Sequence, residues 1–147
     1  APAPAPAAFR VMEVVSVGVD LPEQFPVLVL GEAEGARRQL SFRVGLPEGA
    51  ALARAVGQTM AARPMSGDLL AAVLERFAID VVAVRLVGRY GATYLAELDL
   101  MGSRGREVVP CRPTDGITAA LLQKVPAPVL ADERLLSSTG DVPGPAA

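Results

Sequence analysis

The chain has no histidine and only one cysteine, Cys111, among its 147 residues. Without histidine, neither a histidine general base nor a histidine metal site can form, and one cysteine is too few for a thiolate zinc site. No disulfide can form within the chain, which is typical of a reducing compartment. Because the first residues carry neither a basic leader nor an apolar signal core, we expect a cytoplasmic protein. Any metal would be held by carboxylates, which favour Mg²⁺ or Mn²⁺.

Tryptophan is also absent, and aromatic residues make up only 4% of the chain. We therefore expect a core of valine, leucine and alanine. The net charge of −2 excludes a strongly basic surface, so any contact with nucleic acid must be local. No apolar run is long enough to span a membrane, and no membrane partner is expected.

Lysine occurs once, at Lys124, and every other basic residue is arginine. A composition bias of the genome explains this excess. The functional alternative is that the planar guanidinium suits the recognition of phosphate.

The length predicts a single domain with a substantial core. Residues 1–9 begin with an alanine-proline repeat and read as an extension. Residues 10–137 carry the periodic patterns of a folded domain, and the Gly- and Pro-containing residues 138–147 read as a flexible tail. Alternation and continuous apolar runs predict strands near 10–20, 26–30, 38–44, 79–87, 92–100 and 106–112, and a short one at 129–130. Helical periodicity predicts helices at 46–58, 66–77 and 114–124, and one more turn within 131–137.

Two stretches of the chain have the same construction: Arg63–Phe77, RPMSGDLLAAVLERF, and Arg112–Leu122, RPTDGITAALL. Each has Arg-Pro, then a hydroxyl residue suited to cap a helix, then an aspartate in the first turn. The repeated Arg-Pro corner indicates a duplicated β-then-α unit. We predict an α+β fold, one domain with a mainly antiparallel sheet, built from two related β-meander-plus-helix halves.

Arg63 and Arg112 are the candidate phosphate-binding residues, because each is expected at a strand end beside a helix N-terminus. The alternative is that each arginine pairs with the aspartate three or more residues on and only holds its corner together. Glu48, Asp68 and Asp115 are the candidate catalytic and metal-binding carboxylates. The alternative is that they only stabilise helix starts, since all three fall in predicted first turns.

The order of these segments resembles the bifunctional nuclease domain family, whose members are described as acting on both DNA and RNA. The resemblance runs from about Met12 to Leu136 and is carried by six segments in order: MEVVSVGVDLPEQFPVLVL, GLPEGAAL, RPMSGDLLAAVL, YGATYLAELDL, CRPTDGITAAL and VPAPVLADERLL. It implies nuclease-like hydrolysis of phosphodiesters in DNA and RNA, nucleic acid as partner, and self-association as a homodimer. The residues that match the family pattern are Glu48, Arg63, Pro64, Asp68, Arg112, Pro113 and Asp115.

The chain departs from the family pattern at two positions. Gly67 stands where the family has histidine, and Arg43 stands where an aromatic residue is usual. If the family's histidine performs chemistry, this chain is a catalytically impaired binding or regulatory module that keeps the fold. If it only packs the corner, the carboxylates and arginines still work. Since RPTDG keeps its residue types better than RPMSGDL, we expect Arg112 and Asp115 to matter more than Arg63 and Asp68.

Overall fold

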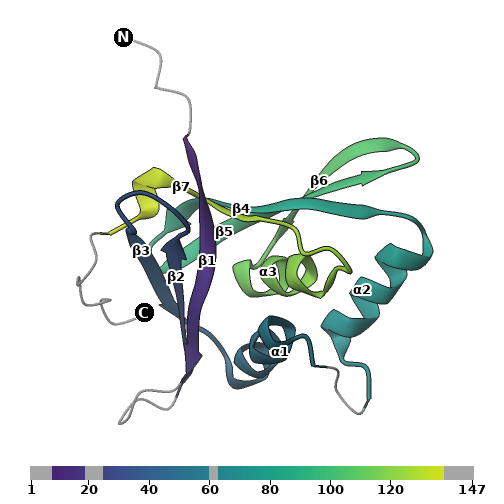
Figure 1. Cartoon of the computed structure of the whole chain (residues 1–147), viewed down its shortest axis with the longest axis horizontal. Helices are drawn as coiled ribbons and strands as arrows, with labels where there is room; N and C mark the ends of the chain where they lie inside the picture. Colours follow the sequence, from purple (N-terminus) through teal and green to yellow (C-terminus); the bar gives the residue numbers. More distant parts are fainter. Residues whose placement is uncertain (1–7, 19–24, 60–62, 138–147) are drawn as a thin grey trace.

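The computed structural model describes residues 8–18, 25–59 and 63–137 (Figure 1). Most of the expected extension and all of the expected tail lie outside these residues. The first strand begins at Phe9, one residue before the expected domain start. No helix in the described ranges is long and apolar enough to cross a membrane.

The described residues form one seven-stranded sheet with the order β3-β2-β1-β7-β4-β5-β6. The strands are β1 (Phe9–Gly18), β2 (Val27–Glu32), β3 (Gln39–Arg43), β4 (Asp80–Tyr90), β5 (Thr93–Gly102), β6 (Gly105–Cys111) and β7 (Val129–Asp132). Neighbouring strands are antiparallel except β4 and β7, which are parallel. The short strand β7 thus joins two meanders, β1–β3 and β4–β6, into one sheet. The predicted α+β fold with a mainly antiparallel sheet is confirmed.

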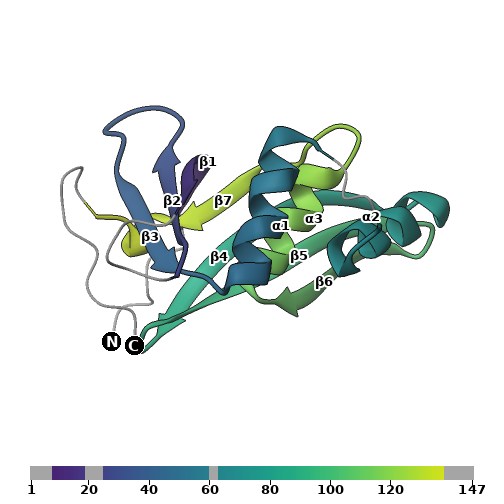
Figure 2. The same ribbon diagram turned by 90° about the horizontal axis from the view of Figure 1, so that it is seen from below.

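Three α-helices, α1 (Leu46–Gly57), α2 (Ser66–Arg76) and α3 (Pro113–Leu122), lie on one side of the sheet (Figures 1 and 2). A 3₁₀ turn, Glu133–Leu135, follows β7. Helices α1 and α3 each follow the third strand of a meander, so the two β-meander-plus-helix halves are present. The equivalent helices are therefore α1 and α3.

The prediction that the repeated Arg-Pro corner marks this duplication is wrong. Helix α2 follows α1 along the chain, and Arg63 lies in a bend and not at a strand end. The corner at Arg112 does leave a strand, since β6 ends at Cys111. The structural repeat is a proline, an acid and a glycine, in Pro47-Glu48-Gly49 and in Pro113 through Gly116.

Each of the two glycines brings its helix unusually close to the structure beneath it. A Cβ on Gly49 would lie 2.7 Å from Cγ of Pro26, and a Cβ on Gly116 would lie 2.6 Å from Cγ2 of Val84. Side chains at these positions have no room, so only glycine permits the observed seating. The two glycines thereby fix the positions of Glu48 and Asp115, the acidic residues that precede them.

The core lies between the sheet and helices α1 and α3, and it is aliphatic as expected. Its fully buried large side chains are Leu28, Leu30, Leu52, Val84, Leu86 and Ile117. Helix α3 is buried along most of its length, whereas α2 buries only Leu74. The predicted apolar stripe of α2 is mostly exposed, with Leu69 at 61% and Phe77 at 73%. Val56 of α1 is also exposed.

Asp99 of β5 is a fully buried carboxylate held by two arginines. Its oxygens accept hydrogen bonds from Nη1 of Arg85 at 2.9 Å, from Nε of Arg106 at 2.8 Å, and from Nη2 of Arg106. The Arg106 hydrogen bonds are the main cause that lowers the pKa of Asp99 to about 2, against an opposing effect of burial. Glu32 forms a similar buried group with Arg38 and Arg10, and its pKa is also lowered to about 2.

We predict that Asp99→Asn lowers the free energy of unfolding by roughly 3 kcal/mol at pH 7, because it leaves Arg85 and Arg106 without their buried partner. In the unfolded chain Asp99 would titrate near its ordinary pKa of 3.8. The ionised carboxylate therefore stabilises the fold above that pH, and the contribution is lost as the pH falls toward 2. In urea unfolding, the difference in free energy of unfolding between wild type and variant should become smaller below pH 4. A difference in free energy that does not change with pH, or that is as small as for the exposed control Glu13→Gln, would contradict a stabilising role of ionised Asp99.

A second prediction concerns the seating of α3. Gly116→Ala should destabilise the protein by roughly 1–3 kcal/mol, since the new methyl group would overlap Val84 and Sγ of Cys111. Gly57→Ala is the matched control, because its nearest neighbour would be 3.9 Å away. That variant should be neutral or stabilise by up to about 1 kcal/mol through helix propensity. Thermal unfolding of the two variants distinguishes these effects, and equal stability would contradict the close contact.

Candidate functional site

Arg112 joins the starts of helices α1 and α3. It occupies the residue before α3, with extended backbone angles of φ −69° and ψ 145°. Its Nε donates to Oδ2 of Asp115 at 2.7 Å and its Nη2 to Oδ1 at 3.1 Å. Its Nη1 donates to Oε1 of Glu48 at 3.4 Å. Three of the five predicted site residues therefore meet in one cluster, which we call the arginine site.

The arginine site is open to solvent. The side chains of Arg112, Asp115 and Glu48 are 64%, 49% and 27% exposed. The pairing of Arg112 with Asp115 that was expected as the alternative is present, but the pair is exposed and not buried. Both carboxylates raise the pKa of Arg112 above its usual value, mainly through the hydrogen bonds of Asp115, so the guanidinium stays charged.

Neither helix start at the arginine site carries a side-chain cap. Pro47 and Pro113 occupy the first turns of α1 and α3, and no side chain accepts a hydrogen bond from the first N–H groups of either helix. Thr114, predicted as the cap of α3, is buried inside its first turn. The cap position belongs to Arg112 because Pro113 suits the first helical residue. The positive ends of two helix dipoles thus lie beside one guanidinium.

Asp68 and Arg63 do not belong to this site. Oδ2 of Asp68 accepts a hydrogen bond from the backbone N–H of Met65 at 2.8 Å, so Asp68 caps its own helix. The cap position of α2 is Met65, and the predicted cap Ser66 is the first helical residue. Asp68 lines a cavity beside Gln58 and Leu122, which lie at the C-terminal ends of α1 and α3. Arg63 precedes α2. The hydrogen-bond partners of Arg112 in the described part of the chain are Asp115 and Glu48, so Arg63 is not part of the arginine site.

The predicted cluster of three metal-binding carboxylates is not formed. In the described part of the chain, no three His, Cys, Asp or Glu side chains lie close enough together to hold a metal ion. Glu48 and Asp115 are the two candidates that the structure brings together, and Arg112 lies between them. A Mg²⁺ or Mn²⁺ ion on this pair stays a prediction, and it would have to compete with the guanidinium.

Cys111 lies next to Arg112 but is not activated. Burial is the main cause that raises the pKa of its thiol, and the nearby Asp115 raises it further. A protonated thiol is a poor nucleophile, so Cys111 serves as a small packing residue of β6.

No sequence pattern pointed to a cluster of Phe42, Tyr94 and Arg89. The rings of Phe42 and Tyr94 lie 5.1 Å apart, and the guanidinium carbon of Arg89 lies 5.8 Å from the centre of the Tyr94 ring. Cys111, the last residue of β6, pairs with Ala96 near the start of β5. Arg112, which follows Cys111, therefore lies toward the end of β5 that carries Tyr94. Phe42 on β3 meets Tyr94 on β5 only because the sheet is curved, since these strands are not neighbours in it.

Gly67, at the position where the resemblance expects histidine, faces helix α3. A Cβ on Gly67 would lie 3.1 Å from Cγ2 of Thr118 and 3.9 Å from Cδ1 of Leu122. A side chain at this position would enter the contact between α2 and α3. In this chain the position is therefore one of helix packing.

Because the arginine site is exposed, its loss should cost little stability. We predict that Arg112→Ala lowers the free energy of unfolding by less than about 1 kcal/mol, the range of exposed ion pairs. Chemical denaturation at low and high salt measures this. A loss of several kcal/mol would mean that Arg112 is part of the architecture and not of a functional site.

Comparisons with known proteins agree with the order of motifs. The bifunctional nuclease domain matches residues 28–142. The chain is 32% identical over 129 residues to the uncharacterized protein MT1877 of Mycobacterium tuberculosis (strain CDC 1551 / Oshkosh), covering 88% of this chain and 75% of that protein. The uncharacterized protein Rv1829 of Mycobacterium tuberculosis (strain ATCC 25618 / H37Rv) matches with the same identity and coverage. The chain therefore belongs to the bifunctional nuclease domain family.

Proposed function

We propose that the protein is a nuclease-like phosphodiesterase acting on DNA and RNA, and that the arginine site carries the activity. The observation that supports this is the guanidinium of Arg112 bridging Glu48 and Asp115 at the meeting point of two uncapped helix starts. Membership of the family supports the reaction class. Phosphate is the anion that such a site suits, because a guanidinium fork and free backbone N–H groups bind its oxygens together.

In this proposal the phosphate of the substrate takes the place of a carboxylate on Arg112. The guanidinium then stabilises the charge that develops on the phosphoryl oxygens, and the first N–H groups of α1 and α3 add to it. Asp115, released from Arg112, orients and deprotonates the attacking water. The water oxygen bonds to phosphorus as the bond from phosphorus to the leaving sugar oxygen breaks, and that oxygen takes a proton from solvent. Glu48 and Asp115 are the residues that would hold Mg²⁺ or Mn²⁺, which would neutralise further charge on the phosphate.

Nucleic acid is the proposed partner, and its contact would be local. Arg89 is exposed beside the Phe42–Tyr94 ring pair and would supply a second cation for such a contact. Arginine and aromatic side chains together suit an unpaired strand, whose bases can stack.

A second candidate function is a binding or regulatory module that keeps the fold and lacks catalysis. The observation in its favour is the pairing of Arg112 with both carboxylates, which must open before either can act on water. The net charge of −2 also favours weak binding of nucleic acid. Binding without cleavage would identify this function.

The test is cleavage of single- and double-stranded DNA and RNA, with Mg²⁺, with Mn²⁺ and with a chelator. We predict that Arg112→Ala lowers the cleavage rate by about 10²- to 10³-fold, as for loss of one donor to a charged transition state. Asp115→Asn should lower it by about 10²- to 10⁴-fold through loss of the base. Arg104→Ala is the matched control, because Arg104 lies in the turn between β5 and β6, away from Arg112 along the chain.

The outcomes separate the two functions. Wild-type protein that binds oligonucleotides without cleaving them, and loses binding in Arg112→Ala, is the regulatory module. Variants that cleave as fast as wild type remove the arginine site from the reaction, and wild type that neither binds nor cleaves ends the nuclease proposal. The homodimer stays a prediction, which a scattering mass equal to one chain would contradict.

A further inference from the structure

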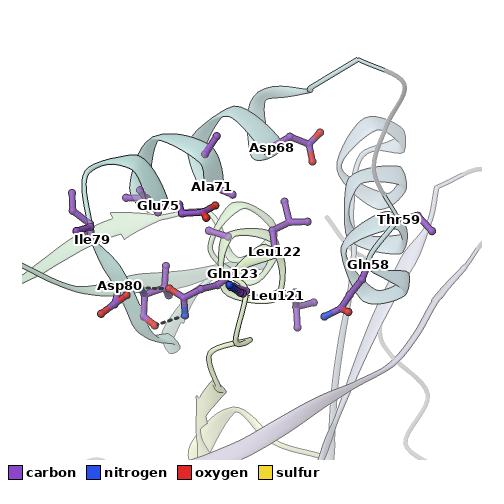
Figure 3. A pocket seen from close by; sticks show the side chains of 16 residues that line it. Gln58, Thr59, Asp68, Ala71, Glu75, Ile79, Asp80, Leu121, Leu122 and Gln123 are labelled. Atoms are coloured by element: carbon purple, nitrogen blue, oxygen red, sulfur yellow. Dashed lines mark hydrogen bonds between the residues drawn. The ribbon is translucent and has the colours of Figure 1, made fainter.

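A cavity of about 540 Å³ lies at the end of α1 and α3 opposite the arginine site. Gln58, which follows α1, and Leu122, the last residue of α3, line it together with the inner side of α2 (Figure 3). Its floor is apolar and includes Leu74, Ala119 and Leu122. A concave apolar surface with a few polar groups is the usual form of a small-molecule site.

The charged groups at this cavity favour a cation. Three carboxylates line it, from Asp68, Glu75 and Asp80, against one ammonium group, from Lys124. Among the described residues no cation pairs with Asp68, Glu75 or Asp80. One oxygen of Asp68 accepts the N–H of Met65, which leaves its other oxygen for a ligand. The C-terminal end of α3 adds partial negative charge, and its last turn has no basic residue to offset it.

The spacing of two carboxylates suggests the shape of the ligand. Asp68 and Glu75 both lie on the cavity side of α2 (Figure 3). They are seven residues apart, which places them about 10 Å apart along the helix axis. Between them the cavity is lined by Ala71, Ala72 and Leu74. Two negative groups separated by an apolar strip match a chain with charged ends and a methylene body.

We infer that this cavity binds a linear aliphatic polyamine, with its terminal ammonium groups at Asp68 and Glu75 and its methylene chain over the apolar floor. Phosphate-bearing ligands are disfavoured, because three carboxylates repel them. A bare metal ion is disfavoured too, since the carboxylates here do not form a three-residue cluster. The inference does not depend on the nuclease proposal, because it uses the opposite end of the helices.

Titration calorimetry of the full chain with spermidine tests the inference. Spermidine is a linear triamine whose terminal groups reach this separation when extended, and its inner ammonium group would face solvent on the open side of the cavity, where Ala72 is exposed. Putrescine is too short to bridge the two carboxylates, butylamine has one charge, and Mg²⁺ has no apolar body. Spermidine should bind at least fivefold more tightly than each of the three. Equal affinity for spermidine and Mg²⁺, or no spermidine binding at millimolar concentration, overturns the inference.

Two variants with opposite expected effects distinguish specific binding of spermidine in the cavity from nonspecific attraction of a cation to an acidic protein. Glu75→Gln should weaken spermidine binding about two- to fivefold, the range of one exposed ion pair. Lys124→Gln should strengthen it by a similar factor, because it removes the like charge. Glu107→Gln, an exposed change of the same kind on β6, is the control. The inference fails if Glu75→Gln and Glu107→Gln bind spermidine alike, or if Lys124→Gln weakens binding.

Discussion

The close seating of α1 and α3 under the sheet is the constraint on which the other features depend. Gly49 lies against Pro26 and Gly116 against Val84, with no space for a side chain at either glycine. These contacts hold the two helices with their starts together, so that Arg112 reaches Glu48 as well as Asp115. The same arrangement brings their C-terminal ends to one cavity. A displacement of either helix would affect both ends at once.

The two ends of this helix pair have opposite electrostatic character for a common reason. Helix dipoles add when helices run in the same direction, so the starts favour anions and the ends favour cations. The charged side chains do not divide in the same way, because Glu48 and Asp115 lie with Arg112 at the starts and Lys124 lies with Asp68 and Glu75 at the cavity. The exposed carboxylates of Glu48 and Asp115 reduce the positive potential at the helix starts.

Five of the arginines hold buried carboxylates of the sheet. Arg10 and Arg38 hold the buried Glu32, Arg85 and Arg106 hold the buried Asp99, and Arg134 holds Asp132. A planar guanidinium can saturate a carboxylate that is buried on a sheet, which a single ammonium group does less completely. The arginine content is therefore compatible with the negative net charge. Arg112 differs because its carboxylate partners are exposed.

The sequence by itself determined the features that depend on near neighbours. Alternation located the strands, and proline with helical periodicity located α1 and α3, because these signals act over a few residues. The order of motifs identified the family. Only the tertiary structure decided that β7 pairs in parallel with β4, and that α1, not α2, is the counterpart of α3. It also brought Glu48 to Arg112 across 64 residues and took Asp68 to the opposite end. Such contacts depend on how helices pack on a curved sheet, where one glycine contact changes which side chains meet.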